Sequence, residues 1–168
     1  MSINDSTPIS QRLLGCFGIA LFLAVAPHQV LAQAADADAV RGILTAYAEF
    51  TQAKNLAAVD SLMAPERGVH IIEGAGVNHG WADYRDRHIG PELADAENFR
   101  YRFYSVEPQI RGDVAWAAFR FDLAAIFRGE AIDREGRGTA VLERRNGRWV
   151  IVHLHTSSRP RPAAGVRP

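Results

Sequence analysis

The chain has 168 residues, and its 19 basic side chains are balanced by 19 acidic ones. This length is enough for one domain of ordinary size. A chain with no net charge lacks the excess of positive charge that attracts nucleic acid or an anionic membrane surface, so we predict neither as a partner.

Residues 1–34 have the composition of a secretory signal peptide. A polar stretch with Arg12 leads into the apolar run 13–26, and Pro27 ends that run. The run has 14 residues, whereas a stable transmembrane anchor needs about 20. Residues 32–34 (Ala-Gln-Ala) give the small-x-small pattern of a cleavage site, so we predict cleavage after Ala34 and a periplasmic or secreted protein. The alternative is an uncleaved helix at the membrane interface.

The only cysteine, Cys16, lies in this leader. The mature chain therefore has no thiol for a disulfide, a nucleophile or a metal ligand. We predict no cofactor and no bound metal. At the other end, residues 159–168 lack apolar side chains at any regular spacing, and we predict a disordered tail after a domain at 35–158.

The first part of that domain is predicted to be mainly helical. Residues 36–54 carry apolar side chains at a period of 3.6, which indicates an amphipathic helix; they are Val40, Ile43, Leu44, Tyr47 and Phe50. Asn55 can cap a second, short helix. Residues 69–73 form a short strand, and 74–76 form a turn or bend. A third helix covers 80–93, and its Gly90-Pro91 step ends or interrupts it.

From Phe99 onward the apolar period changes to two, as in half-buried strands. The predicted strands cover 99–104, 114–127, 138–144 and 149–156. Turns separate them at 112–113, at 128–130 and at Asn146-Gly147, and the last dipeptide is a strong hairpin signal. The order of helices followed by a four-stranded meander predicts one α+β domain. A strongly curved antiparallel sheet, covered by helices on its concave face, leaves a cavity between the two layers.

The segment 138–157 (GTAVLERRNGRWVIVHLHTS) resembles the SnoaL-like members of the nuclear transport factor 2-like superfamily. It is also similar to the association domain of calcium/calmodulin-dependent protein kinase II. Residues 112–116 and 81–93 fall where this superfamily places comparable elements. The resemblance covers about residues 38–158 and implies a cone-shaped fold. Members of the superfamily include isomerases, cyclases, dehydratases and assembly modules, so the fold alone does not select a function.

The resemblance also implies positions for pocket residues. The kinase association domain holds acidic ligands with arginines, and the corresponding positions here are Ala140 and Thr156, with Arg120 the nearest arginine. The steroid isomerase relatives use a carboxylate base that faces a tyrosine. The nearest approximation in this chain is Tyr84 with Asp122 or Glu73.

The residues themselves point to one group of candidate catalytic side chains. Tyr84 and His88 are four apart on a predicted helix, so they share a face with Trp81. If that face lines the cavity, His88 is a candidate acid or base, Tyr84 an orienting donor and Trp81 a candidate pocket residue. Glu73 ends an apolar strand beside a glycine-rich bend, where it either moves protons or pairs with an arginine. The alternative is that the aromatic residues only pack the helix onto the sheet.

Further polar side chains lie in the predicted strands. Arg102 and Arg120 are candidate pocket residues, with Asp122 as their carboxylate partner. His153 and His155 share one face of the last strand. They are candidate pocket residues and, as an alternative, metal ligands, although no third ligand is fixed in sequence.

We therefore predict an exported domain that binds a small, mostly apolar molecule and forms a homodimer through its sheet, with proton-transfer chemistry (isomerisation, cyclisation or dehydration) at Tyr84, His88 and Glu73. One alternative is a non-catalytic association module that depends on residues 149–157. A less favoured alternative is a metal-binding protein that uses His153 and His155.

Overall fold

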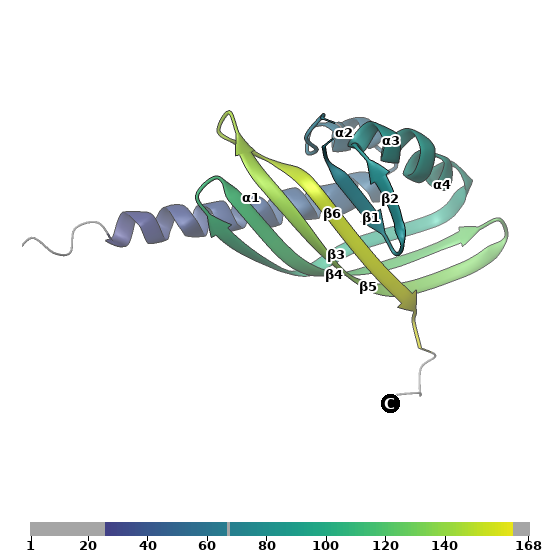
Figure 1. The fold of residues 1–168 in the computed structure, drawn as a ribbon. Coiled ribbons are helices and arrows are strands. Elements are labelled where there is room, and N and C mark those ends of the chain that lie inside the picture. Colours follow the sequence, from purple (N-terminus) through teal and green to yellow (C-terminus); the bar gives the residue numbers. More distant parts are fainter. Residues whose placement is uncertain (1–25, 67, 163–168) are drawn as a thin grey trace, which may run out of the picture.

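The computed structural model describes residues 26–66 and 68–162, which form helices packed against one curved sheet (Figure 1). In chain order the elements are α1 (Ala26–Gln52), α2 (Leu56–Asp60), β1 (His70–Glu73), β2 (Gly76–His79), α3 (Trp81–Tyr84), the π-helical turn η1 (Arg85–Ile89), α4 (Gly90–Asp95), β3 (Ala96–Arg111), β4 (Val114–Phe127), β5 (Glu130–Arg145) and β6 (Arg148–Pro160). The predicted α+β fold, with a curved sheet and helices on its concave face, is confirmed.

The six strands are arranged in the order β2-β1-β6-β5-β4-β3. β3 to β6 form the predicted antiparallel meander. β1, however, pairs in parallel with β6, so the sheet is mixed and not wholly antiparallel. This pairing joins segments about eighty residues apart in sequence, and no local pattern encodes it. β2 was not expected either, because its sequence (GVNH) has a single apolar side chain.

Two of the predicted hairpins are built on turns that require positive φ angles. Asn146 and Gly147 have φ angles of 51° and 78°, and Arg128 and Gly129 have φ angles of 51° and 82°. Two successive positive values are typical of the type I′ turn, whose twist matches that of the strands it joins. Glycine accepts this geometry without steric cost, so the Asn146-Gly147 prediction is confirmed for a clear physical reason.

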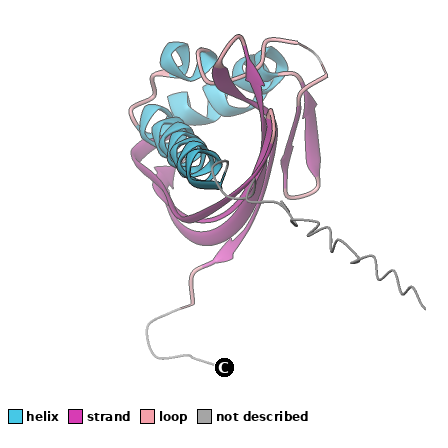
Figure 2. Ribbon diagram, turned by 90° about the vertical axis from the view of Figure 1, so that its left-hand side faces the viewer, coloured by secondary structure: helices cyan, strands magenta, loops and turns pink. Residues whose placement is uncertain are grey.

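The curvature of the sheet comes from irregular positions in its long strands. The pairing of β3 with β4 is interrupted twice, between Glu97 and Arg100 and between Tyr104 and Glu107. A residue with positive φ lies inside each interruption, Asn98 at 52° and Ser105 at 50°. Such bulges bend a strand and increase its twist. They allow β3 to curve around α1, as the view along the helix shows (Figure 2).

The main core lies between α1 and the concave face of the sheet. Val40, Leu44 and Tyr47 are at most 2% exposed, as the amphipathic pattern predicted. The Tyr47 ring stacks on Phe103 at a centroid distance of 5.8 Å, and Phe103 stacks on Phe119 at 4.1 Å. Each fully buried side chain of this size stabilises the fold by about 1.5–3 kcal/mol.

The third helix is interrupted before Gly90-Pro91, as predicted. Gly90 donates its backbone N–H to the carbonyl of Arg85, five residues earlier, which closes a π-helical turn. A Cβ atom at residue 90 would lie 2.4 Å from that carbonyl oxygen, so only glycine fits. π-helical turns of this kind occur often at functional sites.

The ends of the described chain differ from the predicted domain boundaries. Of the predicted leader, residues 1–25 lie outside the described residues, and 26–34 form the first turns of α1. Residues 30–35 are all exposed, and within 30–52 the first fully buried side chain is Val40. β6 continues through Pro160, two residues past the predicted domain end, while 163–168 lie outside the described residues.

Within residues 26–66 and 68–162, no helix is both long enough and apolar enough to span a membrane.

Candidate functional site

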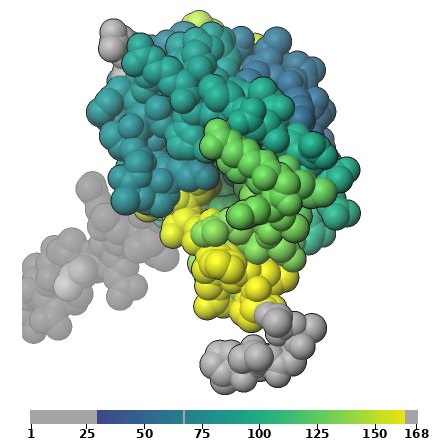
Figure 3. Space-filling model, turned by 90° about the vertical axis from the view of Figure 1, so that its right-hand side faces the viewer, coloured from purple at the N-terminus to yellow at the C-terminus, as the bar shows by residue number. Residues whose placement is uncertain are grey.

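A cavity of about 210 Å³ lies at one end of the cone, between the α3–α4 segment and the ends of the long strands. Figure 3 looks onto this end, where a hollow separates the teal helical segment from the green β5 and the yellow β6. Most of its lining is apolar: Ile89, Leu93, Ala96, Phe99, Phe121, Leu123, Ala125, Phe127 and Ile132. The polar lining residues are Tyr47, Thr51, Glu73, Tyr84, Glu92, Tyr101, Arg134 and Ser158. A cavity whose apolar lining is combined with several polar groups is typical of a ligand site.

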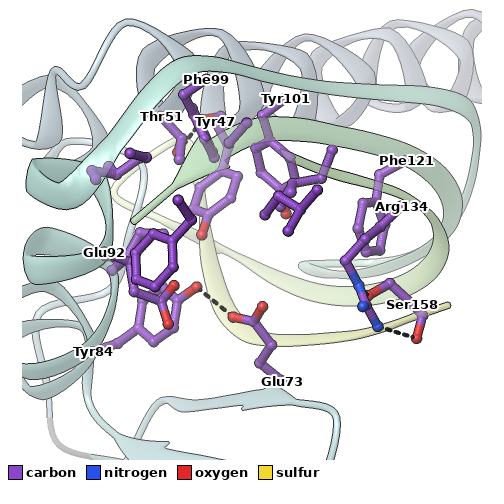
Figure 4. Close-up of a pocket in the computed structure, with 17 residues that line it drawn as sticks. Tyr47, Thr51, Glu73, Tyr84, Glu92, Phe99, Tyr101, Phe121, Arg134 and Ser158 are labelled. Carbon is purple, nitrogen blue, oxygen red and sulfur yellow. Dashed lines mark hydrogen bonds between the residues drawn. The ribbon is translucent and has the colours of Figure 1, made fainter. Parts of the chain in front are cut away.

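Tyr84 and Glu73 form the main polar contact in the cavity wall. The Tyr84 hydroxyl donates a hydrogen bond to Oε2 of Glu73 over 3.0 Å (Figure 4). Glu73 faces inward because it lies two residues after Ile71, which is 2% exposed, and alternate strand residues share a face. The structure therefore brings together two of the three predicted catalytic residues, a carboxylate and a phenol.

Three tyrosine hydroxyl groups share this cavity. Burial is the main cause that raises the pKa values of Tyr47, Tyr84 and Tyr101, and the negative charge of Glu73 adds to it. All three phenols therefore stay protonated across the physiological range and act as hydrogen-bond donors. Among the described residues, the Tyr101 hydroxyl makes no hydrogen bond to another side chain or to the backbone, so it is free to donate to a ligand.

His88 does not line the cavity but lies behind the two carboxylates of its wall. Its Nε2 atom is 3.7 Å from Oε2 of Glu73 and 3.3 Å from Oε1 of Glu92. Its Nδ1 atom is 2.9 Å from Oδ1 of Asn78, whose amide nitrogen donates to Asp83. An amide oxygen only accepts, so Nδ1 of His88 carries the proton and Nε2 faces the carboxylates. The prediction that His88 itself projects into the cavity is corrected: it reaches the cavity only through Glu73 and Glu92.

Glu92 is a further carboxyl group at the cavity wall. Partial burial raises its pKa above the ordinary value of 4.5, the charge of Glu73 raises it further, and His88 opposes the change. The folded protein therefore holds this proton more tightly than the unfolded chain does. The associated stability is present below the ordinary pKa and is lost as the pH rises through the higher, folded-state pKa.

We expect the Glu92→Gln variant to be more stable than the wild type at neutral pH, and this difference to vanish below the ordinary carboxyl pKa. The effect is small, because the Glu92 side chain is 49% exposed. Urea unfolding at neutral pH and at a pH below the ordinary carboxyl pKa measures the difference in the free energy of unfolding. The matched control is Glu97→Gln, an exposed carboxyl outside the cavity; an equal change in both variants would contradict the prediction.

Trp81 was predicted to line the pocket, but the structure places it elsewhere in the core. It is 5% exposed, and its indole N–H donates to Asp60 of α2. Its ring centroid lies 6.0 Å from that of Tyr84. Trp81 therefore supports Tyr84 from behind and is not part of the cavity lining.

Arg102, Arg120 and Asp122 were also predicted to line the pocket, and this placement is corrected. They lie on the outer face of the sheet, because the alternate residues Phe119 and Phe121 point inward. Arg102 donates to Asp122 over 2.7 Å, and Arg120 lines a separate groove on the outer face. Desolvation raises the pKa of Asp122, but hydrogen bonds from Arg102 and Arg161 outweigh it and lower the pKa overall.

His153 and His155 lie on the outer face as well, because Leu154 and Thr156 between and after them are buried. Their placement in the pocket is therefore corrected too. His153 lies beside His70 of β1, and desolvation, followed by His155 and His70, lowers its pKa. In the part of the chain that the structure describes, no three His, Cys, Asp or Glu side chains are arranged to hold a metal ion.

The pocket positions implied by the kinase association domain do lie on the concave face, but they cannot hold an acid here. Ala140 is fully buried, and Thr156 is 7% exposed. Instead, the basic group of the cavity is Arg134, which sequence reasoning missed together with Tyr47 and Tyr101. Tyr47 belongs to the apolar pattern of the first predicted helix, and Tyr101 lies in the strand predicted at 99–104, so neither stands out as a polar pocket residue. Arg134 fell outside the strand predicted at 138–144, although β5 in fact begins at Glu130.

A family model described as the SnoaL-like domain matches residues 40–162 of the chain. A search of curated proteins finds no match. Among solved structures, the fold is similar to a nuclear transport factor 2-like superfamily protein from Salmonella enterica serovar Typhimurium. The TM-score is 0.68 at 18% identity, over 79% of this chain and 96% of that chain.

Two further structures carry names that refer to a reaction. One, from Shewanella frigidimarina, is provisionally named a ketosteroid isomerase; its TM-score is 0.61 at 26% identity, over 69% of this chain and 92% of that chain. The other, from Streptomyces avermitilis, is provisionally named a dehydratase of this superfamily; its TM-score is 0.66 at 18% identity, over 77% of this chain and 99% of that chain.

Proposed function

Since the chain belongs to the SnoaL-like domain family, we propose that its cavity binds a small, mostly apolar carbonyl compound and moves a proton on it. The names of the two neighbours, an isomerase and a dehydratase, support chemistry of this class. The observation that carries the proposal is the carboxylate of Glu73, held by the Tyr84 hydroxyl at the wall of an apolar cavity.

Each part of this arrangement has a chemical role. Glu73 accepts the proton from the carbon atom next to the ligand's carbonyl group, and the negative charge then moves to the carbonyl oxygen. The hydroxyl of Tyr101 is free to donate a hydrogen bond to that oxygen, which stabilises the charge. If the ligand has a C=C bond conjugated with the enolate, return of the proton from Glu73 to the far carbon gives isomerisation. If it has a hydroxyl group on the next carbon, transfer of the proton from Glu73 to that oxygen releases water and forms a C=C bond, which is dehydration.

His88 acts as a positioning residue in this scheme. Its protonated Nδ1 is held by Asn78, so its Nε2 faces Glu73 and Glu92 in a fixed orientation. From there it lies against both carboxylates and limits how their side chains can turn. It touches neither the cavity nor a ligand in it.

The proposal is tested with benzylacetone, an apolar ketone with exchangeable protons beside its carbonyl group. Calorimetry measures its binding, and proton NMR in heavy water measures the enzyme-dependent loss of those protons. We expect the Leu123→Trp variant, which puts a larger ring into the cavity, to abolish both signals. The control is Val77→Trp, since Val77 is 48% exposed and lies on another part of the molecule. The proposal is wrong if benzylacetone does not bind the wild type, or if it binds Leu123→Trp and Val77→Trp equally well.

We further propose a homodimer through the outer face of the sheet. Val114 and Trp116 are two residues apart on β4, so they share that face, and they are 42% and 43% exposed. Burial of such a surface against a second copy would stabilise the pair. Light scattering should find a dimer for the wild type and a monomer for Trp116→Glu. A monomeric wild type would contradict the dimer, and a large ring would favour the association module.

Export to the periplasm or the medium remains our proposal for location. The exposure of residues 30–35 supports it, because cleavage after Ala34 would leave the core contacts of α1 in place. Mass spectrometry of the protein recovered from cell fractions should find a chain that begins at Ala35. An intact N-terminus in the cytoplasmic fraction would refute export.

A further inference from the structure

Arg134 is a cationic group at the cavity wall whose charge is not balanced within the described part of the chain. Its Nε donates to the Ser158 hydroxyl over 2.8 Å, and its Nη2 donates to the Ser158 carbonyl oxygen over 3.0 Å. No carboxylate of residues 26–66 and 68–162 forms an ion pair with it. Arg159 and Arg161, by contrast, pair with Glu135 and Asp133 on the outer face.

The side chain of Arg134 is well placed to receive a ligand. Ser158 engages one edge of the guanidinium group and fixes its plane, while Nη1 makes no hydrogen bond to the described residues. A guanidinium group has five N–H donors in a rigid fork, so donors remain for a second partner. A planar carboxylate is the partner that this geometry fits best.

The charged groups of the cavity lie in different parts of its wall. Tyr84 and Glu92 lie at one side of the cavity and Arg134 and Ser158 at the other, and the carboxylate of Glu73 lies beside Tyr84 toward the space between them (Figure 4). Phe121 lies beside Arg134 (Figure 4), and further apolar side chains complete the lining. An anionic group is therefore repelled by Glu73 and attracted by Arg134, and the apolar lining screens these interactions poorly.

We propose that the natural ligand of this cavity is an amphipathic anion whose carboxylate is bound by Arg134. The apolar body of the ligand lies along the aromatic lining, and its reactive carbonyl group points toward Glu73. This inference rests on the proposed function, because it uses the same cavity. It adds the class of ligand and the direction in which the ligand lies.

The test compares two probes of nearly the same shape, hydrocinnamate and benzylacetone. Hydrocinnamate carries a carboxylate where benzylacetone carries a methyl ketone. Calorimetry is expected to give roughly ten- to hundredfold tighter binding of hydrocinnamate to the wild type, as a hydrogen-bonded charge pair allows. Arg134→Gln is expected to remove this preference and to leave the affinity for benzylacetone within about twofold. The matched control Arg137→Gln, an exposed arginine on the outer face of the same strand, should change neither affinity.

The outcomes separate this inference from the proposed function. If benzylacetone binds as well as or better than hydrocinnamate, the anionic ligand is refuted while the apolar ligand site stands. If Arg134→Gln weakens both probes equally, Arg134 only shapes the cavity, and the inference is again refuted. If neither probe binds the wild type, the proposed function fails as well. The preference of the wild type needs no variant, so the test holds even where Arg134→Gln does not fold.

Discussion

Replacement of Gly138 by alanine is expected to lower the free energy of unfolding by roughly 2 kcal/mol. A Cβ atom at this position would lie 2.2 Å from Cζ of Phe119 and 2.9 Å from the backbone oxygen of His155. The Phe119 ring cannot move aside easily, because it stacks on Phe103 at 4.1 Å and is 3% exposed. The backbone of β6 is fixed by its pairing with β5. Equilibrium unfolding in urea measures the loss.

The matched control is the same substitution at Gly42 in α1. No atom lies within 4 Å of a Cβ at this position, and alanine is the better helix former. We therefore expect Gly42→Ala to raise the free energy of unfolding by about 0.5–1 kcal/mol. If Gly138→Ala lowers the free energy of unfolding and Gly42→Ala raises it, contact with the aromatic rings decides the effect of the added methyl group. Equal stability of Gly138→Ala and the wild type would mean that the ring is free to shift, contrary to the packing described.

The second large effect is expected in the chemistry of the cavity. Glu73→Gln should reduce the rate of proton exchange on benzylacetone by about a hundredfold or more, since a positioned general base contributes roughly 10²–10⁴-fold. The amide keeps the size of the side chain and can still accept a hydrogen bond from Tyr84, but it cannot take up the proton. Proton NMR in heavy water gives the rate, and calorimetry shows whether the ketone still binds.

Glu107→Gln serves as the control, because Glu107 is an exposed carboxyl on β3 and forms no ion pair among the described residues. Its exchange rate should equal that of the wild type. Retention of the full rate by Glu73→Gln would remove Glu73 from the mechanism. Loss of binding together with rate would instead assign Glu73 to ligand recognition.

Local patterns in the sequence predicted the elements whose structure depends on near neighbours. The amphipathic helix around Leu44, the cap at Asn55 and the hairpin at Asn146-Gly147 are all observed. Each rests on spacing or on the backbone preference of one or two residues. The same holds for the interrupted helix at Gly90-Pro91.

The placement of polar side chains on the two faces of the sheet was less predictable. Arg102, Arg120 and Asp122 alternate with aromatic residues, but alternation does not say which face encloses a cavity. Here the aromatic residues face inward and the charged residues form ion pairs outside. Arg134 was missed because the first half of β5 (EAIDREGR) has too few apolar residues to be recognised as a strand.

The class of fold, the order of most elements and the meander of the four strands β3, β4, β5 and β6 could be predicted from the sequence, because they follow from periodicity, turn chemistry and short connections. The contact of Glu73 with Tyr84 and the position of Arg134 across the same cavity are known only from the folded chain. Both depend on long-range packing, because β1 pairs with β6 across a long stretch of chain and bulges in β3 bend the sheet around α1. Contacts of that kind depend on how whole elements pack, and no local pattern records them.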